Sequence, residues 1–114
     1  MTFEDVRAMA LAWPGVEDGT SYGTLALKVR GRLLTRLKED GESLVVKGVG
    51  FDERDMLMEA DPRVFYITDH YRNWPSVLVR LSAARPEVVR KLLLRHWQEI
   101  APKKLVEAFL GEKG

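Results

Sequence analysis

The sequence predicts an α+β domain of two layers, in which an antiparallel sheet of about five strands carries helices on one face. Several short segments alternate apolar and polar residues, as half-buried strands do. Other segments repeat apolar residues every three or four positions, as amphipathic helices do. Turn residues separate these segments at short intervals, and the expected order of elements is αβββαββαα. The other face of the sheet is expected to meet water.

A helix over residues 3–13 is expected first. Thr2 and Asp5 have the spacing of an N-terminal cap, and apolar residues follow at helical intervals until Pro14. Residues 17–23 are polar and rich in turn formers, so they are expected to connect this helix to the sheet.

Three strands are then expected as an antiparallel meander. Residues 25–30 alternate apolar and polar side chains, and Arg30–Gly31 is expected to turn into a second strand over residues 32–38. A polar turn around Gly41 leads to a third strand over residues 43–49.

The remaining elements are two strands and three helices. A short helix is expected over residues 51–60, ended by a proline, and strands over residues 64–68 and 77–81. Apolar residues mark one side of a long helix over residues 86–101, which begins with proline. A last helix follows to residue 111.

The chain is expected to form one domain in a reducing compartment. Its 114 residues suit a single core, which we expect over residues 1–111, with a polar tail over residues 112–114. Cysteine is absent, which excludes disulfides and thiolate chemistry. The chain has neither a membrane-spanning apolar run nor a basic signal-like start, so we expect a cytoplasmic protein, either a monomer or a weak homodimer.

Charge is distributed unevenly along the chain. The net charge is +1, from 18 basic and 17 acidic residues. It is the balance of −3 over residues 1–27, +3 over residues 28–50, −4 over residues 51–70 and +5 over residues 71–114. A near-neutral total therefore does not argue against a polyanionic partner.

Basic residues in the first two strands occupy even positions. Because side chains alternate between the faces of a strand, these residues are expected on one face, opposite Leu27, Val29 and Leu33. Such a ladder would suit a phosphate backbone, although a solvated sheet face carries charge for solubility as well. The expected nucleic-acid-binding residues, with two from later strands, are Lys28, Arg30, Arg32, Arg36, Lys38, Lys47 and Arg80.

A second candidate site is the aromatic loop over residues 69–75. Its members His70, Tyr71 and Trp74 could stack on bases or hold a small ligand, or could instead close one end of the core. The loop contains no nucleophile motif, so catalysis is not expected. With two histidines and no cysteine, neither a transition-metal site nor a cofactor is expected.

Short motifs follow one another in a fixed order along nearly the whole chain. They are residues 11–17 (LAWPGVE), 21–23 (SYG), 27–31 (LKVRG), 46–47 (VK), 60–62 (ADP), 65–71 (FYITDHY), 74–79 (WPSVLV), Trp97 and 101–105 (APKKL). With these motifs the chain resembles the MmcQ/YjbR family. The resemblance implies a small bacterial α+β domain grouped with secretion-chaperone-like folds and usually described as DNA-binding. The chain departs from the family at Asp69, where proline is frequent, and at residues 74–76, where the order Tyr-Pro-Trp is common.

The sequence therefore predicts a DNA-binding module without enzymatic activity that contacts phosphates through a basic sheet face. The alternative is a domain that binds a protein or a small ligand through residues 69–75.

Overall fold

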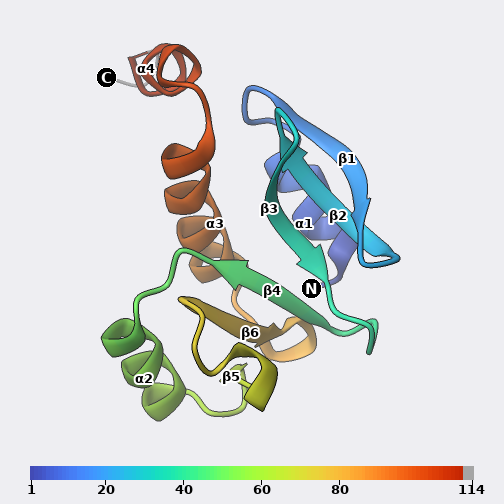
Figure 1. Ribbon diagram of the computed structural model, residues 1–114, viewed down its shortest axis with the longest axis vertical. Helices are drawn as coiled ribbons and strands as arrows, with labels where there is room; N and C mark the ends of the chain where they lie inside the picture. Colours follow the sequence, from blue (N-terminus) through green and yellow to red (C-terminus); the bar gives the residue numbers. More distant parts are fainter. Residues whose placement is uncertain (112–114) are drawn as a thin grey trace.

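A computed structural model describes residues 1–111, so the predicted polar tail over residues 112–114 lies outside the described residues. One antiparallel sheet of six strands forms the framework (Figure 1). Its order is β1-β2-β3-β4-β6-β5. The strands are β1 (Val16–Ser21), β2 (Thr24–Val29), β3 (Arg32–Leu37), β4 (Ser43–Lys47), β5 (Phe65–Tyr66) and β6 (Ser76–Arg80).

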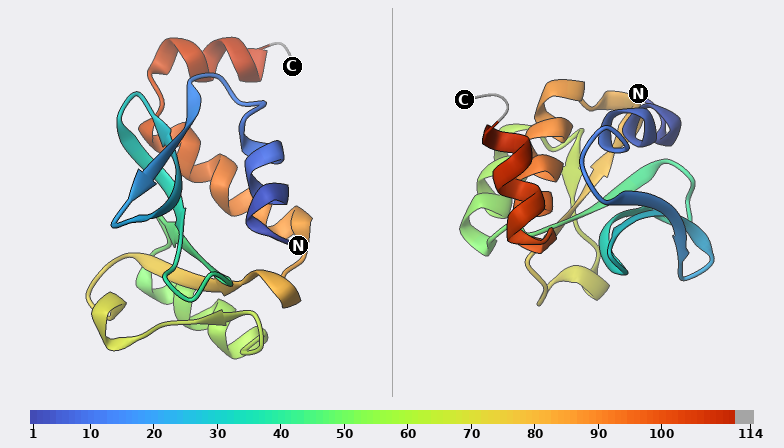
Figure 2. Two further views of the ribbon diagram at one scale, coloured as in Figure 1. Left: turned by 90° about the vertical axis from the view of Figure 1, so that its right-hand side faces the viewer. Right: turned by 90° about the horizontal axis from the view of Figure 1, so that it is seen from above.

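Four helices complete the α+β fold, as the sequence predicts. They are α1 (Phe3–Ala10), α2 (Phe51–Ala60), α3 (Pro86–Ile100) and α4 (Lys103–Gly111). Helices α1 and α3 lie on the same side of the sheet, which we call the inner face (Figure 2). Valine and leucine side chains from this face pack against Val6, Leu93 and Trp97 of the two helices to form the main core. None of the helices in residues 1–111 is long and apolar enough to cross a membrane.

The sheet has six strands, one more than the sequence pattern located. Residues 16–21 form the edge strand β1 instead of a connecting loop, paired along its length with β2. A two-residue turn at Tyr22 and Gly23 joins these strands, and both residues have positive φ, 51° and 76°. The polar composition that favoured a loop is also typical of edge strands, which carry charge to prevent further pairing.

The first helix is shorter than expected and ends at Ala10. Its predicted cap is confirmed: the Thr2 hydroxyl accepts from the backbone of Asp5, and the Asp5 carboxylate accepts from the backbone of Thr2.

A β-bulge changes which side chains of β3 face the core. Leu27 lies opposite Thr35 but Lys28 lies opposite Leu33, so Leu34 is an extra residue in β3. Leu34 and Thr35 are both fully buried, whereas Leu33 is half-buried and pairs with Lys28 on the outer face, the face away from α1 and α3. The prediction that all even-numbered residues of this hairpin share one face is therefore wrong, because a bulge reverses the alternation.

The outer face is only partly exposed, which corrects the expectation that it meets water throughout. Val45 and Leu78 pack there against Tyr71, with Tyr66 and Ile67 beside them. Tyr71 belongs to the short 3₁₀ turn η1 (Asp69–Tyr71), so the 69–75 loop folds back over the sheet. This loop forms one wall of the site described next.

Candidate functional site

The candidate site is a groove on the outer face, between the β1–β2 turn and the 69–75 loop. Two adjoining hollows of about 340 and 290 Å³ form it. Both are lined by Tyr22, Arg36, His70 and Tyr71. The first hollow extends to Lys38, Glu39 and Thr68, and the second extends to Leu33, Val45, Lys47, Trp74 and Ser76.

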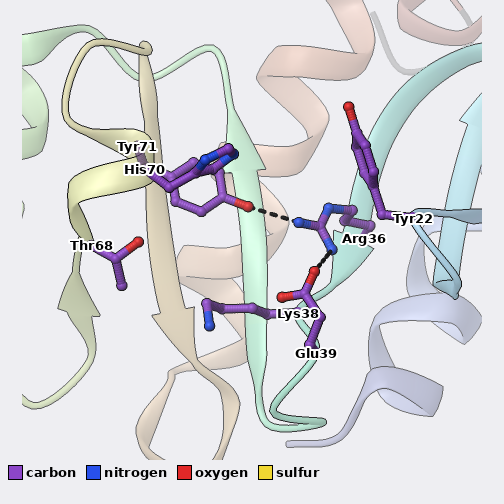
Figure 3. A pocket seen from close by; sticks show the side chains of 7 residues that line it. All are labelled: Tyr22, Arg36, Lys38, Glu39, Thr68, His70 and Tyr71. Carbon is purple, nitrogen blue, oxygen red and sulfur yellow. Dashed lines mark hydrogen bonds and ion pairs between the residues drawn. The ribbon is translucent and has the colours of Figure 1, made fainter.

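Arg36 of β3 forms the floor of the groove (Figure 3). Only 7% of its side chain is exposed. Its Nη2 donates to the Tyr71 hydroxyl at 2.8 Å, and its Nη1 donates to Glu39 Oε1 at 3.0 Å and to Thr24 Oγ1 at 3.3 Å. The Arg36 guanidinium thus ties the hairpin to the loop and places a paired positive charge at the base of the groove.

Tyr22 forms one wall. The centre of the Arg36 guanidinium lies 5.2 Å from the Tyr22 ring centroid, within the range of a cation–π contact. Even so, 84% of Tyr22 is exposed. The ring therefore stands beside the groove with most of its surface open to solvent.

The opposite wall is the 69–75 loop. The rings of His70 and Tyr71 meet edge to face, with centroids 4.9 Å apart. His70 is exposed and Tyr71 is buried, while Trp74 is 60% exposed. Tyr71 is thus a core residue of this face, and His70 and Trp74 offer their side chains to the groove.

Arg54 of α2 holds this loop in place from behind. Its Nη1 donates to the carbonyl oxygens of Tyr71 at 3.0 Å and Trp74 at 2.8 Å, and its Nη2 donates to that of Arg72 at 3.0 Å. Arg54 is 5% exposed, and no carboxylate pairs with it among residues 1–111. The loop carbonyls therefore solvate a buried charge, which fixes the loop backbone.

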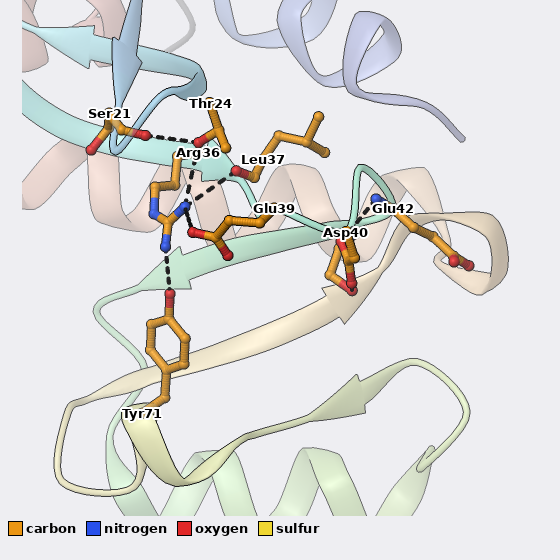
Figure 4. A network of polar contacts seen from close by, with 9 residues as sticks. Ser21, Thr24, Arg36, Leu37, Glu39, Asp40, Glu42 and Tyr71 are labelled. Carbon is orange, nitrogen blue, oxygen red and sulfur yellow. Dashed lines mark hydrogen bonds and ion pairs between the residues drawn. The ribbon is translucent and has the colours of Figure 1, made fainter.

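A polar cluster lies in the β3–β4 turn, next to Glu39 (Figure 4). Asp40 accepts hydrogen bonds from the backbone of Glu42 and Ser43 and from the Ser43 hydroxyl, each at 2.9 Å. Partial burial opposes ionisation of Asp40, but these hydrogen bonds outweigh it and hold its pKa below the usual value. The turn beside Lys38 is therefore well ordered around a carboxylate.

The bulge divides the seven predicted binding residues. By strand register, Lys28, Arg36, Lys47 and Arg80 lie on the outer face, where Lys38 also lines the groove. Arg32 lies opposite Val29, whose side chain enters the core on the inner face. Arg32 therefore lies on the inner side of the sheet, at the exposed end of the hairpin. Arg30 occupies the turn itself.

These residues also differ in their partners. Arg36 is paired with Glu39, whereas the other six have no carboxylate within 4.0 Å in the described part of the chain. Arg80 lies over the Tyr66 ring at 4.0 Å and donates to the carbonyl oxygens of Pro62 and Arg63. Lys28 lies across Gly19 of the neighbouring strand. The cations left without a carboxylate beside the groove are thus Lys38 and Lys47.

Basic residues of α3 belong to a different surface. Arg95 forms a two-point ion pair with Glu53 of α2, at 2.6 and 2.8 Å, and donates to the Gly48 carbonyl at 3.3 Å. This pairing lowers the pKa of Glu53. Helix α3 packs on the inner face of the sheet, whereas the groove lies on the outer face.

His96 is buried beneath the β4–α2 connection. Its Nδ1 lies 3.5 Å from Glu99 Oε1, and burial lowers its pKa. Gly48 makes this approach possible: a Cβ there would lie 2.7 Å from both His96 Nδ1 and Glu99 Oε1. Residues 1–111 contain no cluster of three acidic or histidine side chains suited to a metal ion.

Comparison with a protein-family model matches residues 11–99 to the YjbR family. The chain belongs to the YjbR family. Among curated relatives, the uncharacterized proteins Mb2600 of Mycobacterium bovis and Rv2570 of Mycobacterium tuberculosis are each 33% identical over 84 residues. The match covers 71% of this chain and 65% of each relative, so the chain spans about two thirds of their length.

A solved structure shares the YjbR fold. The Deinococcus radiodurans protein DR2400, described with a DUF419 domain, superposes with a TM-score of 0.72 at 21% identity. The superposition covers 87% of this chain and 78% of DR2400. At that identity, the similarity shows a common fold and carries no function.

Sequence reasoning missed two residues of this YjbR site. Tyr22 stands in a segment expected to be a loop, and the available signal was Gly23, which suits the second position of a two-residue turn. Arg54 lies in an acidic helix and gives no sequence signal, because its partners are backbone carbonyls 17 to 20 residues away.

Proposed function

We propose that this YjbR domain binds DNA through the outer face of its sheet and that it acts without catalysis. The observation that carries the proposal is the charge around the groove: Lys38 and Lys47 line it and have no carboxylate within 4.0 Å among the described residues. A lysine without a partner is available to a phosphate, and its binding releases condensed counterions.

The supporting cations surround this centre. Lys28 lies farther along β2 on the same face, and Arg30 stands at the exposed hairpin turn. Arg36 supports the groove and is not counted as a phosphate contact, because its guanidinium already donates to Glu39 and Tyr71. Arg80 is likewise engaged by Tyr66 and two carbonyls. The proposed phosphate contacts are therefore Lys28, Arg30, Lys38 and Lys47.

Titration of fluorescent DNA with purified protein tests the proposal. At about 50 mM salt, we expect measurable binding that weakens about tenfold in a variant carrying Lys38→Ala and Lys47→Ala. Lys104→Ala is the matched control, because Lys104 is an exposed lysine of α4 on the helical side of the molecule. Absence of binding by the unchanged protein would refute the proposal, as would an equal loss in the control.

A small-ligand site is the second candidate. The larger hollow, about 340 Å³, falls in the size range of small-molecule pockets, and it combines aromatic rings with charged groups. A soluble anionic metabolite that displaced DNA and bound with higher affinity would favour this candidate.

A further inference from the structure

We infer that the groove accepts unpaired bases, so that the DNA bound by this domain is single-stranded; this inference rests on the proposed function. The groove combines two exposed aromatic rings, Tyr22 and Trp74, with lysines that have no carboxylate partner in the described structure. Sites that bind single strands use this combination: aromatic rings stack on base faces, and cations follow the backbone.

Tyr22 has the properties of a stacking platform. Its φ of 51° lies in the left-handed region, which is unfavourable for a bulky side chain, and asparagine suits this turn position better. The turn therefore does not explain a tyrosine at this place. Arg36 steadies the ring through its cation–π contact while 84% of the residue stays exposed.

Trp74 has matching properties on the opposite wall. Its backbone is fixed by Arg54, which donates to its carbonyl oxygen at 2.8 Å, yet 60% of the residue is exposed. The chain has two other tryptophans, Trp13 and Trp97, and these are 3% and 0% exposed in the core. Exposure of the third indole at a groove wall is thus a local feature of the site.

Stacking distinguishes single strands from duplexes. In a duplex, the base faces are covered by neighbouring bases, and only base edges and phosphates remain accessible. The rings of Tyr22 and Trp74 can stack only on bases whose faces are free. Lys38 and Lys47, which line the same groove, would then contact the adjoining phosphates.

The test compares an oligothymidine of about 12 nucleotides, a duplex of the same length and thymidine monophosphate. We expect the oligothymidine to bind at least tenfold more tightly than the other two. Tyr22→Asn removes the ring and keeps a residue suited to the turn, so it should lower the affinity for oligothymidine about tenfold without loss of stability. Trp74→Ala should lower it similarly. Met56→Ala is the control, because Met56 is also 60% exposed but lies on α2.

Tryptophan fluorescence gives an independent measurement. Because Trp13 and Trp97 are buried, quenching by bound oligothymidine should come from Trp74 and disappear in Trp74→Ala. Equal affinity for duplex and single strand, with both aromatic variants unaffected and the lysine variant weakened, would overturn the inference and leave the proposed function standing. Thymidine monophosphate that binds as tightly as the strand would also overturn it. No binding to any of the three would refute the proposed function and the inference together.

Discussion

Arg54 is predicted to be the main support of the groove wall, and Arg54→Met tests this. The substitution keeps most of the apolar stem and removes the guanidinium, whose central carbon lies 4.9 Å from the Phe51 ring centroid. Three hydrogen bonds of 2.8 to 3.0 Å to the 71–74 backbone are lost. Hydrogen bonds from charged groups contribute about 1.5 kcal/mol or more each, but removing a buried charge also removes its desolvation cost. We therefore expect a net loss of about 3 kcal/mol.

Urea denaturation at neutral pH measures this loss. A domain of this size has an unfolding free energy of about 5 to 15 kcal/mol, so a loss of about 3 kcal/mol moves the midpoint clearly. Arg63→Met is the control: the Arg63 side chain is 88% exposed, and its ion pair with Asp61 is 3.8 Å long, so we expect a change below about 0.5 kcal/mol. An Arg54→Met midpoint equal to that of the control would show that Arg54 does not support the groove wall.

Three further predictions follow from the same contacts. Gly48→Ala places a Cβ 2.7 Å from His96 Nδ1 at a φ of 76°, so it should lower the free energy of unfolding in urea by at least about 2 kcal/mol. Gly41→Ala is the control and should lower it by about 1 kcal/mol, because Gly41 has a φ of 71° and an added Cβ there meets nothing within 4 Å. Equal losses in the two variants would contradict the close contact at Gly48. Tyr71→Phe removes the 2.8 Å hydrogen bond to Arg36, so it should lower the free energy of unfolding by about 1 to 2 kcal/mol and speed hydrogen exchange in residues 69–75. Unchanged exchange would argue against a link between Arg36 and the loop. Burial lowers the pKa of His96, so the unfolded chain takes up a proton at a higher pH than the folded chain does, and the free energy of unfolding should fall as the pH drops below about 6.5. In His96→Gln this fall should be smaller between about pH 7.5 and 5.5. An identical fall in the variant would contradict the role of His96.

Much of the fold could be predicted because its signals are local. The period of the long helix, its initial proline, the Thr2–Asp5 cap and the Arg30–Gly31 turn each depend on a few neighbouring residues, and each appears as expected. The family resemblance, carried by motifs spread along the chain, is confirmed as membership of the YjbR family.

The site was harder to predict because its decisive features depend on distant contacts. The bulge at Leu34 reverses the alternation of β3 without any distinctive residue, so the parity of the basic positions misplaced Arg32 and Leu33. Arg36 looked like a surface cation, but the 69–75 loop covers it and Tyr71 bonds it from 35 positions away. In residues 69–75, Tyr71 closes the small outer core, while His70 and Trp74 line the groove; their role in binding stays a prediction.

The salt dependence of oligothymidine binding tests whether the groove lysines contact phosphates. If Lys38 and Lys47 each contact a phosphate, replacing both with alanine should reduce the slope of log affinity against log salt by about 1.4, because each contact to a single strand contributes about 0.7. The double variant should show this smaller slope together with weaker binding. An unchanged slope in the double variant would contradict it.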